Sequence, residues 1–398
     1  NLLLTITDNK VSAIGNSAFE RAKIKDAVFG EAVTLGTDVF KSANIKNIQF
    51  DNLAILTQNA FSSATLNTVK IDGLTQMESD VFSNNSTLET ITFGDNCTIQ
   101  NIASRAFKGC RNLKNVTLCG SLKSTSLNAF EECVSLEDIT LPEGFETLGY
   151  GTFQKCSSLR NINFPTTLLK IDSFALYECS AFTNINLRSS LAEVASNAFK
   201  GSGITNIKFD VSQGNGLVAS SAFAGCEELI SVDLTLNNMG ENVFKDCINL
   251  KFVYIKFVGN NSTMKAPFSG CTSLETIVLD GEVPTITNDN AESLYLFKGI
   301  NPMKIYIPQN TKDNYLAVNE WVEYTMYLTE IDCSNGFVKN DSGKLLKATS
   351  NTNPISVPSD VTALSDFAFS GMSNLKVLEF NTTSVLTASA ITHLFDGV

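Results

Sequence analysis

The sequence predicts an α/β repeat protein in which many short units stack into a solenoid. Three observations lead to this fold class. The chain of 398 residues contains 27 Phe but only 8 Tyr and 1 Trp, so one residue type is used repeatedly. Phe recurs in one local context at intervals of about 23 residues. Most recurrences precede a short apolar pattern of period two, which is typical of a strand with one buried face.

Each unit contains a Phe anchor, usually preceded by a small residue. An aliphatic residue lies five positions before most anchors, and a small residue, most often Cys, lies three positions after. Leu176 takes the anchor position once. The thirteen anchors are Phe19, Phe40, Phe61, Phe82, Phe107, Phe130, Phe153, Leu176, Phe199, Phe223, Phe244, Phe268 and Phe297.

The strand of each unit is expected in the motif L-x-x-I-x-L, as in Leu136-x-x-Ile139-x-Leu141. A unit of this length has room for one strand and one return segment but not for a long helix. Because such a unit cannot bury its apolar face alone, the units must stack and share one core. The strands then form a parallel sheet, and the anchors stack into a spine.

The stretch from Asn128 to Leu141, NAFEECVSLEDITL, resembles BspA-type leucine-rich repeat surface proteins. The resemblance implies a right-handed leucine-rich repeat solenoid. Its parallel sheet would lie on the concave face, with short helical turns or strands on the convex face. It also implies a secreted or cell-surface protein of host-associated bacteria or parasitic protists that binds host or microbial partners.

Three regions are expected along the chain. Residues 1–304 form the repeat array of about 13 units. Residues 305–330 form a capping segment, with an N-capped helix over about 313–324, because a solenoid needs a cover over its last core layer. Residues 331–398 open a second array, and we expect the chain to end inside one of its units.

Charge and composition disfavour several functions. The net charge of -12 disfavours binding to nucleic acids. No apolar run reaches the length of a membrane span. His393 is the only histidine, which disfavours a His-based triad or a His-rich metal site. We therefore expect no enzyme activity, no catalytic residue and no metal or other cofactor.

Seven of the ten cysteines share one position of the repeat: Cys110, Cys133, Cys156, Cys179, Cys226, Cys247 and Cys271. Identical side chains in a stack point in parallel, so their Cβ atoms stay too far apart for disulfides. The spacing C-x-x-C does not occur, which disfavours zinc. These cysteines are predicted to be buried free thiols.

The residues beside the middle Ile of each strand face outward and are mostly Asn and Thr. Asn161, Asn163, Asn184 and Asn186 could bind a glycan or peptide, or they could form a solvated ladder of stacked polar groups. Asp138 and Asp233 are the only acidic residues in these columns between 115/117 and 276/278, and they lie four repeats apart, about 19 Å. A glycosidase pair needs a much shorter distance.

An apolar stretch interrupts these outward columns at Phe252, Tyr254, Val278 and Tyr306. Exposed apolar clusters often mark contact sites, so these four residues are candidates for ligand binding. The alternative is that the extra length at residues 280–294 forms a loop that covers them.

The function expected from these features is non-catalytic binding or adhesion at the cell surface by a monomer. The partner would be a host or microbial surface protein or a glycan, and a signal or anchor would lie upstream of this sequence. Two alternatives stay open. The chain could be an accessory or carbohydrate-binding part of a polysaccharide-active system, or a structural spacer of a longer surface protein.

Overall fold

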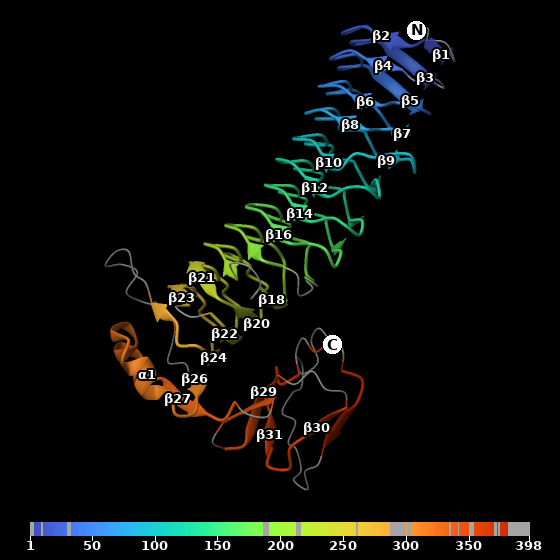
Figure 1. Cartoon of the computed structure of the whole chain (residues 1–398). Helices are drawn as coiled ribbons and strands as arrows, with labels where there is room; N and C mark the ends of the chain where they lie inside the picture. The colour runs from blue at the N-terminus through green and yellow to red at the C-terminus, as the bar shows by residue number, and fades with distance from the viewer. Residues whose placement is uncertain are drawn as a thin grey trace. The chain divides into compact units, whose positions relative to one another are not determined.

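Figure 1 shows the computed structural model of the chain. The structure describes residues 4–8, 11–29, 33–185, 191–211, 216–259, 262–286, 300, 304–333, 336–340, 342–349, 354–369, 372 and 375–380. The chain divides into two compact units. Unit 1 comprises Asn1–Gly203 and Val218–Ala224, and unit 2 comprises Ile204–Leu217 and Gly225–Val398.

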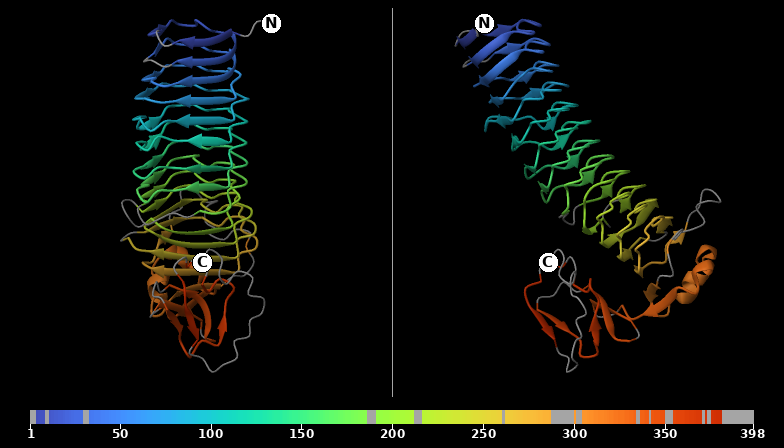
Figure 2. Two further views of the ribbon diagram at one scale, coloured as in Figure 1. Left: turned by 90° about the vertical axis from the view of Figure 1, so that its right-hand side faces the viewer. Right: turned by 180° about the vertical axis from the view of Figure 1, so that it is seen from behind.

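Unit 1 is a β-solenoid whose strands pair in parallel with their counterparts in the neighbouring repeats (Figures 1 and 2). The longer strands form one line: β1 (Leu4–Asp8), β3 (Lys23–Phe29), β5 (Asn44–Phe50), β7 (Thr68–Ile71), β9 (Thr90–Phe93), β11 (Asn115–Thr117), β13 (Asp138–Thr140) and β15 (Asn161–Asn163). Two-residue strands form a second line: β2 (Ala13–Ile14), β4 (Thr34–Leu35), β6 (Ile55–Leu56), β8 (Gln76–Met77), β10 (Asn101–Ile102), β12 (Ser124–Thr125), β14 (Thr147–Leu148), β16 (Lys170–Ile171) and β17 (Glu193–Val194). The predicted parallel sheet is therefore confirmed.

The anchors from Phe19 to Phe268 lie in tight turns flanked by left-handed residues, and Phe297 lies outside the described residues. In the repeat of Phe61, for example, Asn59 and Ser63 have φ values of 54° and 56°. Small polar residues and Gly adopt this conformation at lower cost than bulky residues. This requirement explains why Asn, Asp, Ser or Gly so often stands two positions from an anchor.

The anchors form the predicted Phe spine. The rings of Phe40 and Phe61 stack with centroids 5.0 Å apart and planes within 4°, and those of Phe107 and Phe130 stack at 4.9 Å. Where Leu176 replaces Phe, Phe182 packs against Phe199 at 6.3 Å. The rings lie at the spacing of neighbouring strands, so each repeat completes the core of the next.

Unit 2 continues with the same kind of repeat. Its longer strands form one parallel sheet: β18 (Asn206–Asp210), β20 (Ser231–Leu236), β22 (Phe252–Phe257), β24 (Thr276–Gly281), β26 (Lys304–Pro308) and β27 (Leu328–Ile331). Short strands again form a second line: β21 (Asn238–Glu241), β23 (Thr263–Lys265) and β25 (Thr285–Ile286). Another short strand, β19 (Leu217–Val218), lies between β17 and β21 in the sequence.

The segment predicted as a cap contains two short helices, α1 (Lys312–Leu316) and the 3-10 helix η1 (Asn319–Tyr324). The expected single helix is divided because Val318 is extended (φ -95°, ψ 111°). Thr311 makes no capping bond, since its hydroxyl donates to the carbonyl of Pro308. Trp321 is fully buried and donates its indole N–H to the carbonyl of Pro284 at 3.0 Å.

A further group of strands follows in unit 2: β28 (Phe337–Lys339), β29 (Lys344–Ala348), β30 (Ile355–Val357), β31 (Ala363–Leu364) and β32 (Leu378–Phe380). β30 pairs in parallel with β32, in the register Ile355 to Leu378. Phe369 lies in a separate apolar core there. The three regions expected from the sequence, 1–304, 305–330 and 331–398, stay a prediction.

The fold class needs one correction. The described residues form a parallel β-solenoid in which α1 and η1 are the only helices, so the α part of the predicted α/β class is not confirmed. The described return segments are strands of two to four residues and turns, because the left-handed residues beside the anchors end any helical path. The right-handed winding stays a prediction.

Candidate binding surfaces

The exposed face of the β11, β13 and β15 strands carries a ladder of polar side chains in unit 1. In the parallel register Asp138 lies beside Asn161, and Thr140 lies beside Asn163. The Asn161 side chain donates a hydrogen bond to the Asp138 carboxylate at 2.6 Å. A similar bond joins Asn47 to Asp26 at 2.9 Å. These bonds fix the orientation of donors and acceptors that remain open to solvent.

A shallow cleft of about 480 Å³ lies over β11 and β13. Its lining residues are Lys114, Asn115, Val116, Thr117, Ser135, Glu137, Asp138, Ile139 and Thr140. Polar and charged groups dominate this lining, so the cleft suits a ligand with many hydrogen-bonding groups rather than an apolar molecule.

Three of the four predicted polar site residues lie on this surface. Asn161, Asn163 and Asn184 are exposed, and Asn184 donates to the Thr183 hydroxyl at 3.3 Å. Asn186 lies outside the described residues. The expected ladder of mutually bonded polar groups is therefore present at Asn161, and ligand binding by these residues stays a prediction.

The apolar stretch in unit 2 is buried, so the expected exposure of Phe252, Tyr254, Val278 and Tyr306 is wrong. All four side chains are at most 5% exposed. The residues that pack with them are Ile331, Val338, Leu346 and Phe367. The ring of Phe367 stacks on that of Phe252 at 5.4 Å.

The cover over this apolar stretch differs from the expected loop. Val338 and Leu346 belong to β28 and β29, so the strands that follow the capping segment provide much of the cover. The expected loop lies largely at residues 287–294, outside the described residues. Asp280 alone contributes a contact from that region, since the Tyr254 hydroxyl donates to its carboxylate at 2.6 Å.

A charged cluster accompanies these buried apolar residues in unit 2. Lys347 on β29 is 2% exposed, and its ammonium lies 2.8 Å from the Asp233 carboxylate on β20. Lys208 on β18 lies 3.7 Å from the same carboxylate. Burial lowers the pKa of Lys208, while the Asp233 charge raises it and the Lys347 charge lowers it further. One carboxylate thus balances two lysines.

A second cleft, of about 750 Å³, lies within unit 2 beside β27 and β28. Several of its charged groups have partners within the cleft. Lys339 forms an ion pair with Asp360, and its hydrogen bond lowers the pKa of the Asp360 carboxyl. The Glu330 carboxylate accepts a bond from the backbone N–H of Lys312 at 2.8 Å.

The repeated cysteines are buried free thiols, as predicted. Each of five thiols donates to the carbonyl of the anchor in the preceding repeat, for example Cys156 to Phe130 at 3.1 Å and Cys179 to Phe153 at 3.0 Å. Asn85 occupies the same position in an earlier repeat and donates to Phe61 at 2.6 Å. The position three residues after the anchor therefore favours a small side chain that can donate a hydrogen bond to the preceding anchor's carbonyl.

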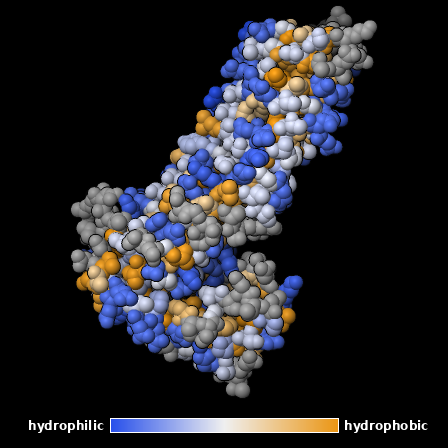
Figure 3. Space-filling view, viewed as in Figure 1, coloured by the Kyte–Doolittle hydropathy of each residue, from blue (hydrophilic) through white to orange (hydrophobic). Residues whose placement is uncertain are grey.

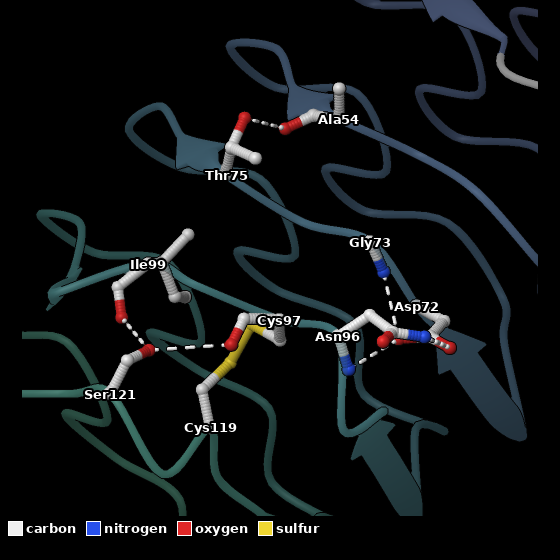
Figure 4. The surroundings of a disulfide bond; sticks show 9 residues. All are labelled: Ala54, Asp72, Gly73, Thr75, Asn96, Cys97, Ile99, Cys119 and Ser121. Carbon is white, nitrogen blue, oxygen red and sulfur yellow. Dashed lines mark hydrogen bonds between the residues drawn. A yellow bond between two sulfur atoms is a disulfide. The ribbon is translucent and has the colours of Figure 1, made fainter.

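Two other cysteines form a disulfide that was not predicted, Cys97–Cys119 in unit 1 (Figure 4). Their Cα atoms are 5.6 Å apart. Thr117 pairs with Thr92, so Leu118 and Phe93, the next residue of each strand, are equivalent. Cys119 is one residue after Leu118, whereas Cys97 is four residues after Phe93. The two positions are not equivalent, so the parallel-stack argument does not apply to them.

An aromatic cluster on the turn edge of unit 1 was also not predicted. Tyr150, Phe174 and Tyr177 lie in consecutive repeats, and Tyr150 is 41% exposed. Leu127 is 40% exposed one repeat earlier, at the position equivalent to Tyr150. The sequence contains the signal for this cluster, because the equivalent positions of most other repeats carry polar residues. Figure 3 shows hydrophobic residues scattered among hydrophilic ones on one face of the molecule.

Among the described residues, no group of three or more His, Cys, Asp or Glu side chains is placed to hold a metal ion. None of the helices in the described part of the chain is long and apolar enough to cross a membrane.

Comparisons with known proteins point to one family. The family model described as the BspA type leucine rich repeat region matches residues 3–100, 88–205, 193–314 and 293–392. No curated protein matches the chain significantly.

Solved structures of leucine-rich repeat proteins match the chain at low sequence identity. A leucine rich cell surface protein from Faecalibacterium prausnitzii is 18% identical, with 97% of this chain and 93% of that chain covered and a TM-score of 0.39. A leucine-rich repeat protein from Bacteroides ovatus is 19% identical, with 82% and 76% covered and a TM-score of 0.40. A leucine rich repeat protein from T. pallidum is 19% identical, with 62% and 82% covered and a TM-score of 0.28. Because the family model matches nearly the whole sequence, the chain belongs to the BspA-type leucine-rich repeat family.

Proposed function

We propose that this protein is a non-catalytic binding protein, displayed outside the cell, that attaches to a host or microbial surface protein or glycan. The binding surface in this proposal is the exposed polar face of β11, β13 and β15 in unit 1. The observation that carries the proposal is the ladder on this face, in which Asn161 and Asp138 hold each other in a fixed orientation beside a polar cleft.

A ladder of this kind suits an extended ligand. Neighbouring strands lie about 4.8 Å apart, so equivalent donors and acceptors repeat at that interval along the sheet. A glycan or an extended peptide presents hydrogen-bonding groups at regular intervals of its own. Groups that are already oriented lose less conformational entropy when a ligand binds.

The acidic groups of the polar face support binding rather than catalysis. Asp138 is occupied by its bond from Asn161. Asp233, the acidic residue that the sequence places in the same columns, pairs with Lys347. Neither carboxylate is paired with a second one in the way that general acid and base catalysis requires.

The disulfide supports a location outside the cytoplasm. Disulfides persist in oxidising compartments and are rare in reducing ones. Cys97 and Cys119 form such a bond between consecutive repeats, where it links two turns of the solenoid. We further propose that the protein acts as a monomer, which light scattering after size-exclusion chromatography would test.

The experiment compares wild-type protein with a variant of the polar face. The full chain is applied to a printed array of mammalian and bacterial glycans, extracellular proteins and mucin. Thr117→Lys and Thr140→Lys are combined, because Lys70 already occupies this outward column and the fold should tolerate the change. Retention of at least one set of probes is expected to fall at least tenfold.

A matched control separates steric blocking of the polar face from the effect of the added positive charge. Ser86 and Ser157 are exposed outside the strands, so Ser86→Lys combined with Ser157→Lys adds the same two charges elsewhere on unit 1. Its retention should stay within twofold of the wild type. No retention of the wild-type protein by any probe would favour a structural spacer, and release of products from a printed glycan would contradict the non-catalytic proposal.

A further inference from the structure

Unit 1 carries an aromatic cluster on the edge where its repeats turn. The rings of Tyr150 and Phe174 lie 5.3 Å apart, tilted by 43°, and those of Phe174 and Tyr177 lie 5.4 Å apart, tilted by 56°. Tyr150 is exposed, and the other two side chains are partly exposed. We call Tyr150, Phe174 and Tyr177 the turn-edge cluster. It lies away from the polar ladder of β11, β13 and β15.

The turn-edge cluster departs from the pattern of the other repeats. Tyr150 lies three residues before its anchor, where other repeats carry mostly Asn, Thr, Gln, Ser, Glu or Lys, with Leu127 and Leu294 as exceptions. Phe174 lies two residues before its anchor, and Tyr177 one residue after. In these three columns large apolar and aromatic side chains also occur at Leu294 and Tyr295 before Phe297 and at Phe367 before Phe369. Within unit 1 they are confined to the consecutive repeats anchored at residues 130, 153 and 176.

Phe174 occupies a backbone conformation that its residue type disfavours. Its φ is 59°, in the left-handed region, where the equivalent residues of neighbouring repeats are Asn128, Gly151 and Asn197. The anchor position of its own repeat is filled by Leu176, which is fully buried. The Phe174 ring is therefore not needed as an anchor of the core. Strain of this kind in an exposed side chain is more typical of a functional position than of a structural one.

Hydrogen-bonding groups lie beside the rings. The Tyr177 hydroxyl bonds to the Glu178 carboxylate, and this bond raises the pKa of Tyr177. The backbone N–H of Lys155 donates to the carbonyl of Tyr177 at 2.8 Å, so the exposed Lys155 side chain starts next to the cluster. Aromatic faces are thus combined with a carboxylate, an ammonium and a phenol.

We propose that the turn-edge cluster is a second binding site, and that its ligand is a glycan whose pyranose rings stack on Tyr150 and Phe174. One face of a pyranose presents C–H groups, which the negative face of an aromatic ring attracts. Its hydroxyl groups would bond to Glu178 and Lys155. The step between repeats is about 4.8 Å, close to the length of one sugar unit along a chain.

The size of the cluster favours a glycan over a protein partner. A stable protein interface buries about 800 Å² on each partner and uses about 20 residues or more on each side. The turn-edge cluster consists of three aromatic side chains and Leu127, and Ser196 and Asn197 stand in its columns one repeat further along. An apolar patch this small matches one or two sugar rings.

The test uses substitutions that copy neighbouring repeats, so the fold should be kept. Phe174→Asn copies Asn128 and Asn197, Tyr150→Ser copies Ser196, and Tyr177→Lys copies Lys200. The full-length variants and the wild-type protein are applied to a printed array of mammalian and bacterial glycans. The wild type should retain a set of glycans, and each variant should lose at least tenfold in retention of that set while its thermal midpoint stays the same or rises.

Two controls separate this site from the polar face and from a structural effect. The Thr117→Lys/Thr140→Lys variant should keep its binding to the turn-edge glycans. Phe174→Tyr should also keep that binding, because it preserves an aromatic face. With a bound oligosaccharide, saturation-transfer NMR should show the strongest transfer to the C–H protons of one sugar face.

Three results would overturn the proposal. One is that no glycan is retained by the wild type. Another is unchanged retention in Phe174→Asn. The third is a loss in the turn-edge variants that concerns proteins on a protein array rather than glycans, which would assign the cluster to a protein partner. The second and third results leave the polar face untouched, and the first would limit its ligand to a protein, which the Thr117→Lys/Thr140→Lys variant tests on the protein probes.

Discussion

Lys347 on β29 places its ammonium 2.8 Å from the Asp233 carboxylate on β20, so a strand that follows the capping segment is tied to the sheet of the preceding array. Lys347 is only 2% exposed, while the Asp233 side chain is 18% exposed. Removing one partner of a buried ion pair costs more than replacing both, because the remaining charge stays buried.

The Lys347–Asp233 pair predicts an asymmetric double-mutant cycle. Asp233→Asn leaves the two charges of Lys347 and Lys208 close together and is expected to cost about 3–5 kcal/mol of unfolding free energy. Lys347→Met removes the buried charge and leaves Lys208 beside Asp233, so its cost should be smaller. The combined variant should be more stable than the sum of the two changes predicts. Urea unfolding of the four proteins measures this, and simple additivity would show that the pair is not coupled.

The stacked rings of Phe367 and Phe252 predict how the apolar stretch is protected. Phe367→Ala removes a large side chain that is 6% exposed and should cost about 3–5 kcal/mol. It should also increase the fluorescence of a dye that binds apolar surfaces, because Phe252 and Tyr254 lose part of their cover. The exposed Val322 provides the control, since Val322→Ala should change neither signal. Equal dye binding by all three proteins would contradict the cover.

The burial of the repeated cysteines predicts low thiol reactivity and a loss of stability at alkaline pH. Burial raises the pKa of Cys110, Cys179 and Cys271 to about 12, from 9.0. A pKa raised in the folded state means that the contribution to stability is fully present below about pH 9 and is lost as the pH rises towards about 12. The native thiols should resist alkylation at neutral pH, and all free thiols should react in denaturant.

Variants of Cys179 show how much one buried thiol contributes to the loss of stability at alkaline pH. Cys179→Ala should reduce the fall of the urea midpoint between about pH 9 and about pH 11, because one ionising thiol is absent from the unfolded chain. Cys179→Ser keeps a donor for the Phe153 carbonyl and should be more stable than Cys179→Ala at neutral pH by about 1 kcal/mol. A wild-type midpoint that does not fall above pH 9 would argue against buried thiols.

The Cys97–Cys119 disulfide predicts a redox-dependent stability of unit 1. Its cysteines are 22 residues apart, and a closed loop of this size stabilises a protein by about 3 kcal/mol in the chain-entropy model. A reducing agent should therefore lower the urea midpoint of the wild type. The Cys97→Ala/Cys119→Ala variant should match the reduced wild type and should not respond to the reductant. Intact mass under non-reducing conditions should be two hydrogens lighter than the free-thiol mass.

The repeating parts of the fold could be predicted because one physical requirement is imposed on every unit. Phe61 and Phe107 occupy the same position in different repeats, and each is fully buried between neighbouring rings. A residue that recurs at the period of the core identifies that core. The same argument predicted the free thiols, because Cys156 shares its place with six other cysteines.

The parts that could not be predicted depend on contacts between unlike positions. The outward column at Tyr254 is polar in most repeats, so its apolar residues indicated an exposed patch until the distant Val338 and Leu346 were found packed with it. The Cys97–Cys119 bond arises because two consecutive repeats differ in length after their strands. Neither contact follows from the period of the repeat.

The candidate site shows the same division. The exposure of Asn161 and its bond to Asp138 follow from the alternation of the strand and from the parallel register. Predicting the turn-edge cluster would have required knowing which residues flank the anchors at positive φ. The sequence pattern alone does not give the backbone conformation of Phe174.

The most direct test of the proposed function is hydroxyl-radical footprinting of the full chain, free and bound to the array probe that retains it most strongly. Binding through the polar face should protect side chains of β11, β13 and β15, with the clearest change around Thr117 and Thr140. Residues of the buried stretch at Phe252 and Tyr254 should stay unlabelled in both states. Protection confined to other parts of the chain, with no change on β11, β13 and β15, would contradict the account.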